Sequence, residues 1–188
     1  LLQHVIGHGI ERSNIFVDDD DRDSFVQRLA QLLQETGVSC YAWALLDNHF
    51  HLLLLPQNSL LANFMRRLLN GYAVSFNLRH KRAGHLFQNR YKSIVCDQDA
   101  YLMELVRYIH LNPVRAGIVK DIDELASYRW CGHRQLMGVP EVSLIADDEL
   151  IPHFAQWKKV ARKRYLQFLV DGLQRKGPRL SRGGRRTS

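Results

Sequence analysis

Two histidines separated by one apolar residue, His49-Phe50-His51, are the side chains best suited to chemistry, and four leucines follow them directly. In an extended strand alternate side chains share a face, so both imidazoles would point one way and Phe50 the other. They would lie about 7 Å apart and could hold one divalent metal or one phosphate. An isolated pair of this kind is more often two hydrogen-bonded histidines on a half-buried strand, so other residues must complete a site.

A second segment, residues 98–113, supplies such residues. Its apolar side chains recur at helical spacing and Pro113 prevents clean continuation, which predicts one helix. Tyr108 and Asn112 are four residues apart and would share a face of it, as a nucleophile and a third metal ligand. A tyrosine hydroxyl, with a free pKa of about 10, is a poor nucleophile unless a metal polarises the phosphate that it attacks. The buried stripe of this helix is expected at Leu102, Leu105, Val106 and Ile109.

The stretch 48–54 resembles the HUH motif of single-tyrosine transposases, and the chain as a whole is similar to the REP-associated tyrosine transposases. The similarity spans about residues 4 to 138. Besides the HUH-like stretch, four segments carry it in the right order. They are residues 4–9 with 14–16, the basic and aromatic stretch 84–93, the tyrosine helix with its exit at 108–117, and the Tyr-x-Trp element at 127–130.

The resemblance implies a metal-dependent enzyme that cuts and rejoins single-stranded DNA. His49, His51 and Asn112 would hold Mg²⁺ or Mn²⁺, and Tyr108 would form a 5′-phosphotyrosine bond. The substrates would be palindromic REP-type hairpins with single-stranded flanks, bound by a monomer or a homodimer. Tyr101 is the rival nucleophile. It falls on nearly the same helix face, but two turns away, too far to share one metal site, so its distance from Asn112 and the family pattern favour Tyr108.

The chain departs from the family pattern in three places. Leu46-Asp47 stand where Met-Pro is common, and Cys131-Gly132 replace two serines. Asp47 would add a carboxylate near the metal. Asn112 replaces the glutamine of insertion-sequence relatives and offers the same amide oxygen on a shorter arm.

The net charge of +7 is unevenly distributed. Residues 157–188 carry eleven Lys or Arg and one acid, whereas residues 1–156 carry fifteen basic and eighteen acidic residues. Residues 66–92 contain no Asp or Glu, and such a basic segment suits a phosphate backbone, although a solvated face is the alternative. Three aromatic residues there, Tyr72, Phe87 and Tyr91, would stack on bases or belong to the core. The expected DNA contacts are Arg66, Arg67, Arg79, Lys81, Arg82, Arg90, Tyr91, Lys92 and Arg115.

Periodicity and turn residues predict the order β-α-β-β-α-β-α, an α+β fold in which helices pack on one face of an antiparallel sheet, as in the ferredoxin-like palm of HUH enzymes. The strands are expected at residues 3–10, 38–46, 49–56 and 91–96, and the first two helices at about 18–36 and 60–80. Residues 1–138 would form the catalytic domain and 139–176 an acidic connector with a basic helix from 158 to 174. Residues 177–188 would be a disordered basic tail.

Composition excludes several classes. No run of about 20 apolar residues and no signal peptide is visible, and three widely spaced cysteines form no metal motif, so we expect a cytoplasmic protein without a membrane partner. A His-x-His-x-His phosphotransferase or nucleotide hydrolase would need a third histidine where Leu53 stands. A non-catalytic nucleic-acid-binding relative remains an alternative, although the complete set of His, His, Tyr and Asn argues against it.

Overall fold

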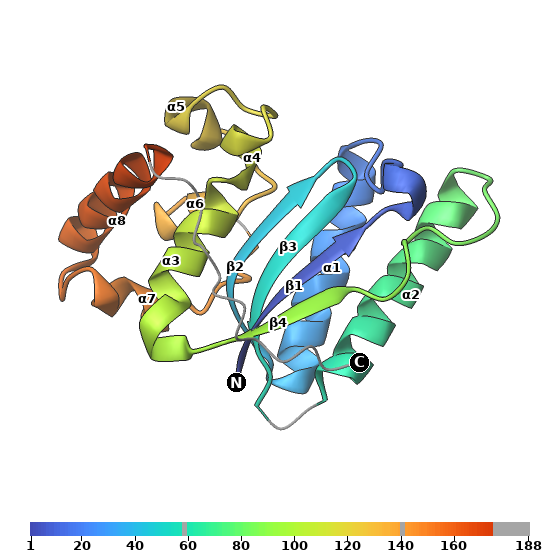
Figure 1. Cartoon of the computed structure of the whole chain (residues 1–188), viewed down its shortest axis with the longest axis horizontal. Helices are drawn as coiled ribbons and strands as arrows, with labels where there is room; N and C mark the ends of the chain where they lie inside the picture. The colour runs from blue at the N-terminus through green and yellow to red at the C-terminus, as the bar shows by residue number, and fades with distance from the viewer. Residues whose placement is uncertain (58–59, 140–141, 175–188) are drawn as a thin grey trace.

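A four-stranded antiparallel sheet lies at the centre of the computed structural model, which describes residues 1–57, 60–139 and 142–174 (Figure 1). Its strand order is β2-β3-β1-β4. The strands are β1 (Leu2–His8), β2 (Ser39–Leu46), β3 (His49–Leu55) and β4 (Lys92–Cys96). The predicted α+β fold with an antiparallel sheet is confirmed, and β2 pairs with β3.

Two long helices, α1 (Asp19–Thr36) and α2 (Leu61–Arg79), pack together on one face of this sheet. Asp18 caps α1 by accepting a hydrogen bond from the Asp21 N–H at 3.1 Å, and Gly37 ends it with a left-handed φ of 67°. The inward side of α2 carries four buried residues at helical spacing: Phe64, Leu68, Tyr72 and Phe76.

The aromatic core on this side explains which way β3 faces. The Phe50 ring lies 5.1 Å from the Phe25 ring of α1, measured between centroids. Across the sheet, Gly7 pairs with Phe50, and a Cβ on Gly7 would approach that ring to 2.4 Å, so only glycine leaves room for it. Phe50 is therefore fixed on the α1 side.

The tyrosine helix, α3 (Gln98–His110), covers the opposite face of the sheet and packs on β2 and β3. The prediction that helices lie on one face only is therefore wrong. The reason is the alternation along β3, because Phe50 faces α1 whereas His51 faces the Tyr108 ring of α3. The stripe expected on α3 is buried as predicted.

Beyond α3 lies the basic helix α8 (Lys158–Leu173), and Figure 1 shows it outside α3. Tyr165 of α8 is fully buried, and its hydroxyl lies 2.8 Å from Nδ1 of His110 on α3. Short helices link the long elements: η1 (Ile10–Arg12), α4 (Asn112–Arg115), α5 (Ile122–Leu125), α6 (His133–Leu136), α7 (Asp147–Leu150) and η2 (Ile151–His153). The expected tail, residues 177–188, lies outside the described residues.

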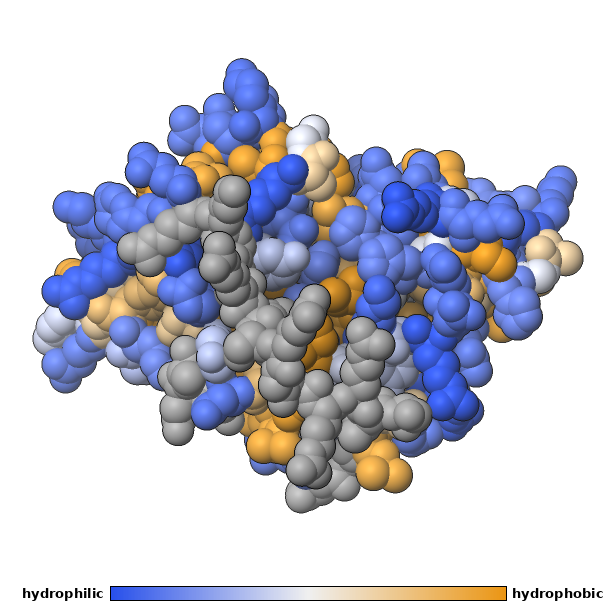
Figure 2. Space-filling model, viewed as in Figure 1, coloured by the Kyte–Doolittle hydropathy of each residue, from blue (hydrophilic) through white to orange (hydrophobic). Residues whose placement is uncertain are grey.

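The surface of the described part is mainly hydrophilic on the side seen in Figure 2, where hydrophobic residues form small separate groups. None of the helices described here is long and apolar enough to cross a membrane.

Candidate active site

Four histidines gather on the sheet face beneath α3. The register of β1 and β3 pairs His8 with His49 and Ile6 with His51, so His4 and His8 share a face with His49 and His51. The ring centroids are 5.0 Å apart for His8 and His49, 5.1 Å for His49 and His51, and 5.3 Å for His4 and His51. The expected histidine pair is thus part of a larger cluster.

Each of the two expected metal ligands has a partner at Nδ1. Nδ1 of His49 donates to Oδ1 of Asn48 at 2.7 Å, and Nδ1 of His51 lies 3.0 Å from Nε2 of His4. A hydrogen bond at one imidazole nitrogen fixes the ring and leaves the other nitrogen for a ligand. The Nε2 atoms of His49 and His51 therefore carry the lone pairs that this arrangement leaves for a metal.

Burial keeps these imidazoles neutral. It lowers the pKa of His51 to about 2, with a further contribution from the neighbouring histidines, and lowers the pKa of His49 and of His4 to about 4. Metal ligation requires the neutral form of histidine. The cluster is consequently in a ligand-competent protonation state at neutral pH.

Tyr108 lies over this cluster in the last turn of α3. The centroid of its ring is 5.9 Å from that of His4 and 6.0 Å from that of His51, with edge-to-face geometry in both cases. Tyr101 stands two turns earlier and is 38% exposed. The structure thus brings Tyr108, and not its rival, against the histidines.

The helix that carries Tyr108 is shorter than predicted. α3 ends at His110, and Asn112 begins the separate short helix α4 with Pro113 in its first turn, where the missing N–H of proline costs least. Asn112 nevertheless stays beside Tyr108, because its Nδ2 donates to the Tyr108 carbonyl at 3.2 Å. That contact leaves the amide oxygen as the atom able to serve as a ligand.

Two cations border the cluster. The Arg115 guanidinium carbon lies 5.5 Å from the centroid of the Tyr108 ring, on the exit from α3. Lys92 pairs with Ile6 in the sheet and so belongs to the histidine face, where its charge helps to lower the pKa of His8 after the effect of burial. Positive charge of this kind would attract a DNA phosphate to Tyr108.

The donor set fits a divalent cation only in part. Within the described ranges, no three His, Cys, Asp or Glu side chains are grouped as metal ligands. A metal held by His49 and His51 would therefore need an oxygen from Asn112 or from the substrate. Asp47, expected near such a metal, is instead bound by Arg22 of α1, with 2.9 Å between Nη2 and Oδ1.

The expected DNA contacts lie in four different places. Arg79 pairs with Asp18 and Asp21 at the start of α1, Arg67 pairs with Glu35, and Arg82 binds Asn77 and the His85 carbonyl, so internal contacts occupy these guanidinium groups. A second group, Arg66, Arg90 and Tyr91, lines a groove on the α2 side of the sheet. Lys92 and Arg115 remain beside the histidines, and Lys81 is exposed in the loop that follows α2.

Two of the three aromatic residues considered for stacking belong to the core. Tyr72 is 1% exposed, and its hydroxyl donates to the Ile15 carbonyl, while Phe87 packs on Phe50. The Tyr-x-Trp element is also structural. The Tyr128 hydroxyl donates to the Leu45 carbonyl at 2.7 Å, and Leu45 N–H donates to the Trp130 carbonyl at 2.8 Å, which fastens this segment to β2.

Sequence reasoning did not select His4 and His8 for the site. The available signal was the alternation His4-x-x-x-His8 in a predicted strand, which places both imidazoles on one face. That spacing does not encode which strand lies beside His4 and His8, or in which register. Their proximity to His49 and His51 therefore could not be derived from the sequence.

Comparison with known proteins identifies the family. The family model described as "Transposase IS200 like" matches residues 1–112, more than half of the chain, from β1 to Asn112. The chain belongs to this transposase family. It is accordingly a DNA-processing enzyme of the transposase type. This assignment agrees with the resemblance found in the sequence motifs. No protein with a curated description matches the chain.

Two solved structures match the chain, and one of them has a TM-score above 0.5. A REP-associated tyrosine transposase bound to a REP hairpin covers 76% of this chain and 89% of its own length, with 18% identity and a TM-score of 0.55. A proposed transposase from Deinococcus radiodurans covers 66% of this chain and 90% of its own, with 18% identity and a TM-score of 0.43. The first match shows that this transposase shares the fold of that protein.

Proposed function

We propose that this transposase cuts and rejoins single-stranded DNA through a covalent bond to Tyr108. The observation that carries the proposal is the position of the Tyr108 ring, 6.0 Å from the ring of His51 and on the same face as His49. A tyrosine next to paired imidazoles can attack a phosphate that is polarised by a metal held on those imidazoles.

The proposed step balances without an external energy source. The Tyr108 hydroxyl oxygen attacks phosphorus, the bond from phosphorus to the 3′ oxygen breaks, and the proton lost by the tyrosine is matched by the one gained at the 3′-hydroxyl. A 5′-phosphotyrosine bond results. A 3′-hydroxyl can later attack that bond, which restores Tyr108 and rejoins the DNA.

His49, His51 and Asn112 are the residues that we propose to hold Mg²⁺ or Mn²⁺. When bound, the metal would polarise the scissile phosphate and offset the charge that develops on it. Asn48 and His4 keep the two histidines oriented for that role. Arg115 places a positive charge beside the ring on which phenolate character develops.

We further propose that the substrates are palindromic hairpins with single-stranded flanks. The hairpin in the structurally matched REP-associated transposase and the cations on the histidine face support this choice. A folded stem offers phosphates to a basic surface, whereas the flexible flank can reach Tyr108.

The test is covalent capture of the DNA. Wild-type protein incubated with flanked hairpin DNA and Mn²⁺ should give a protein–DNA adduct that survives a denaturing gel. Tyr108→Phe should abolish the adduct and retain DNA binding, and Tyr101→Phe is the matched control that should retain both. An adduct that persists in Tyr108→Phe and disappears in Tyr101→Phe would reverse the assignment, and binding without any adduct would favour a non-catalytic DNA-binding role.

A further inference from the structure

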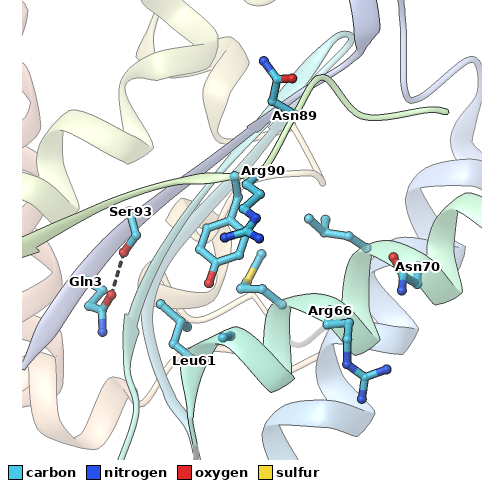
Figure 3. Close-up of a pocket in the computed structure, with 11 residues that line it drawn as sticks. Gln3, Leu61, Arg66, Asn70, Asn89, Arg90 and Ser93 are labelled. Atoms are coloured by element: carbon cyan, nitrogen blue, oxygen red, sulfur yellow. Dashed lines mark hydrogen bonds between the residues drawn. The ribbon is translucent and has the colours of Figure 1, made fainter. Parts of the chain in front are cut away.

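A groove of about 830 Å³ lies between α2 and the edge strand β4, on the sheet face opposite Tyr108 (Figure 3). The alternation along β4 separates it from the histidine face. Lys92 shares its face with Ile6 and the histidines, whereas the next residue, Ser93, points to the groove and donates to Gln3 Oε1 at 2.6 Å. The proposed chemistry at Tyr108 leaves this groove without a role.

The lining combines an apolar floor with a polar and cationic rim. Leu61, Met65 and Leu69 of α2 supply the floor, and Tyr91 is a half-buried aromatic wall facing them. The rim consists of two amides and two guanidinium groups, from Asn70, Asn89, Arg66 and Arg90. No acidic side chain is among these described lining residues, so the groove favours an anion with a flat apolar part.

Arg90 is free to meet such an anion. Its side chain is exposed, and no described residue forms an ion pair with it, in contrast to Arg67, whose charge is paired with Glu35. Arg66 projects at the rim and makes one exposed hydrogen bond, to Oδ1 of Asn63 at 2.8 Å. Asn89 adopts a left-handed φ of 54°, which asparagine tolerates better than most residues.

A nucleotide has the matching chemistry. Its base has an apolar face, which suits Leu69 and Tyr91, and hydrogen-bonding edges, which suit the two asparagines. Its phosphate suits the arginines. The size of the groove is within the range of small-ligand sites, which is about 300–1,000 Å³. We propose that the groove binds one unpaired nucleotide of the DNA substrate, with its base against Tyr91 and Leu69 and its phosphate at Arg66 and Arg90.

This inference rests on the proposed function for the identity of the DNA, but its readout does not require cleavage. The probe is flanked hairpin DNA in which 5-iodo-deoxyuridine replaces one unpaired position at a time, irradiated with Tyr108→Phe protein. One position should crosslink within residues 61–70 or 89–93, as mapped by mass spectrometry. Ala62 is exposed, and in the Tyr108→Phe protein Ala62→Trp would fill the groove with an indole ring. This second substitution should remove the crosslink and weaken hairpin binding by about tenfold.

Matched variants separate the groove from general effects. Val74→Trp adds the same side chain at a 60% exposed position of α2 outside the groove, and it should leave crosslink and affinity unchanged. Arg66→Ala should weaken binding more than Arg67→Ala, although each removes one charge from the same helix.

Two results would overturn the proposal: a crosslink that survives Ala62→Trp, or deoxythymidine monophosphate binding as tightly as the hairpin, since that would make the groove a site for free nucleotides. Adduct formation by wild-type protein on the same DNA tests Tyr108 separately, so either conclusion can fail alone.

Discussion

Nε2 of His4 lies 3.0 Å from Nδ1 of His51, which joins the first strand of the chain to a proposed metal ligand forty-seven residues later. Both side chains are buried, so water cannot replace either partner freely. Loss of this contact should release the His51 ring from its orientation, and partners of this kind typically change metal affinity by about 10- to 100-fold.

The first prediction follows from that contact. His4→Ala should weaken Mn²⁺ binding by about 10- to 100-fold, as measured by titration calorimetry, and cleavage should need correspondingly more metal. His4→Gln can place an amide near the former Nε2 position and should restore much of the affinity. Equal Mn²⁺ affinity in wild type and His4→Ala would show that His4 does not position His51.

The second prediction concerns the proposed ligands themselves. His49→Ala or His51→Ala should abolish adduct formation, because each removes a donor, and EDTA should do the same to the wild-type protein. Added Mn²⁺ should rescue the EDTA-treated wild type but neither variant. Full adduct formation in EDTA would refute the metal mechanism and leave the covalent one standing.

The third prediction distinguishes two cations that sequence analysis placed in one group. Lys92→Ala should reduce the slope of log affinity against log salt for single-stranded DNA by about 0.7, the value for one lost phosphate contact. Arg79→Ala should leave that slope unchanged and lower the thermal midpoint of unfolding by a few degrees, because Asp18 and Asp21 lose their shared partner. A salt slope reduced by Arg79→Ala but not by Lys92→Ala would show that Arg79, and not Lys92, contacts the DNA.

The contrast between Lys92 and Arg79 shows what the sequence could and could not predict. Local patterns determine the elements, so the predicted buried stripe of α3 and the predicted position of α1 agree with the structure. The partner of Arg79 lies sixty-one residues away and depends on how α1 and α2 pack, which no local pattern encodes.

The same limit applies to the site. The period of two along β3 correctly placed His49 and His51 on one face, but the addition of His4 required the cross-strand register. The expectation of helices on one face failed because β3 is covered on both faces, by α1 against Phe50 and by α3 against His51.

The fourth prediction tests the basic C-terminus. Deletion of residues 177–188 should weaken the binding of hairpin and random-sequence DNA by about the same factor, since this Gly- and Arg-rich sequence supplies positive charge, which attracts phosphates whatever the base sequence. Anisotropy titrations of both DNAs give the ratio of specific to non-specific affinity before and after deletion. A collapse of that ratio would show that this segment recognises the hairpin.

The fifth prediction concerns acid stability and the docking of α8. The Tyr165 hydroxyl lies 3.0 Å from Nδ1 of His133 and 2.8 Å from Nδ1 of His110, and all three side chains are fully buried. Burial lowers the pKa of His133 to about 4 and that of His110 well below its ordinary value, and the nearby Cys131 thiol is kept neutral because burial raises its pKa to about 12.

The sign follows from proton uptake. Between pH 6.5 and about 4 the unfolded chain binds protons at these histidines and the folded chain does not. Their contribution to the free energy of unfolding is therefore complete above pH 6.5 and decreases as the pH drops. For His133 the loss at pH 5.5 should be about 1 kcal/mol, from urea unfolding at pH 7.5 and 5.5. His133→Asn keeps a polar group near the Nδ1 position but cannot titrate, so the difference between the two pH values should shrink by that amount. An unchanged difference in this variant would mean that His133 does not contribute to acid destabilisation, and the loss would then have to originate at other buried groups.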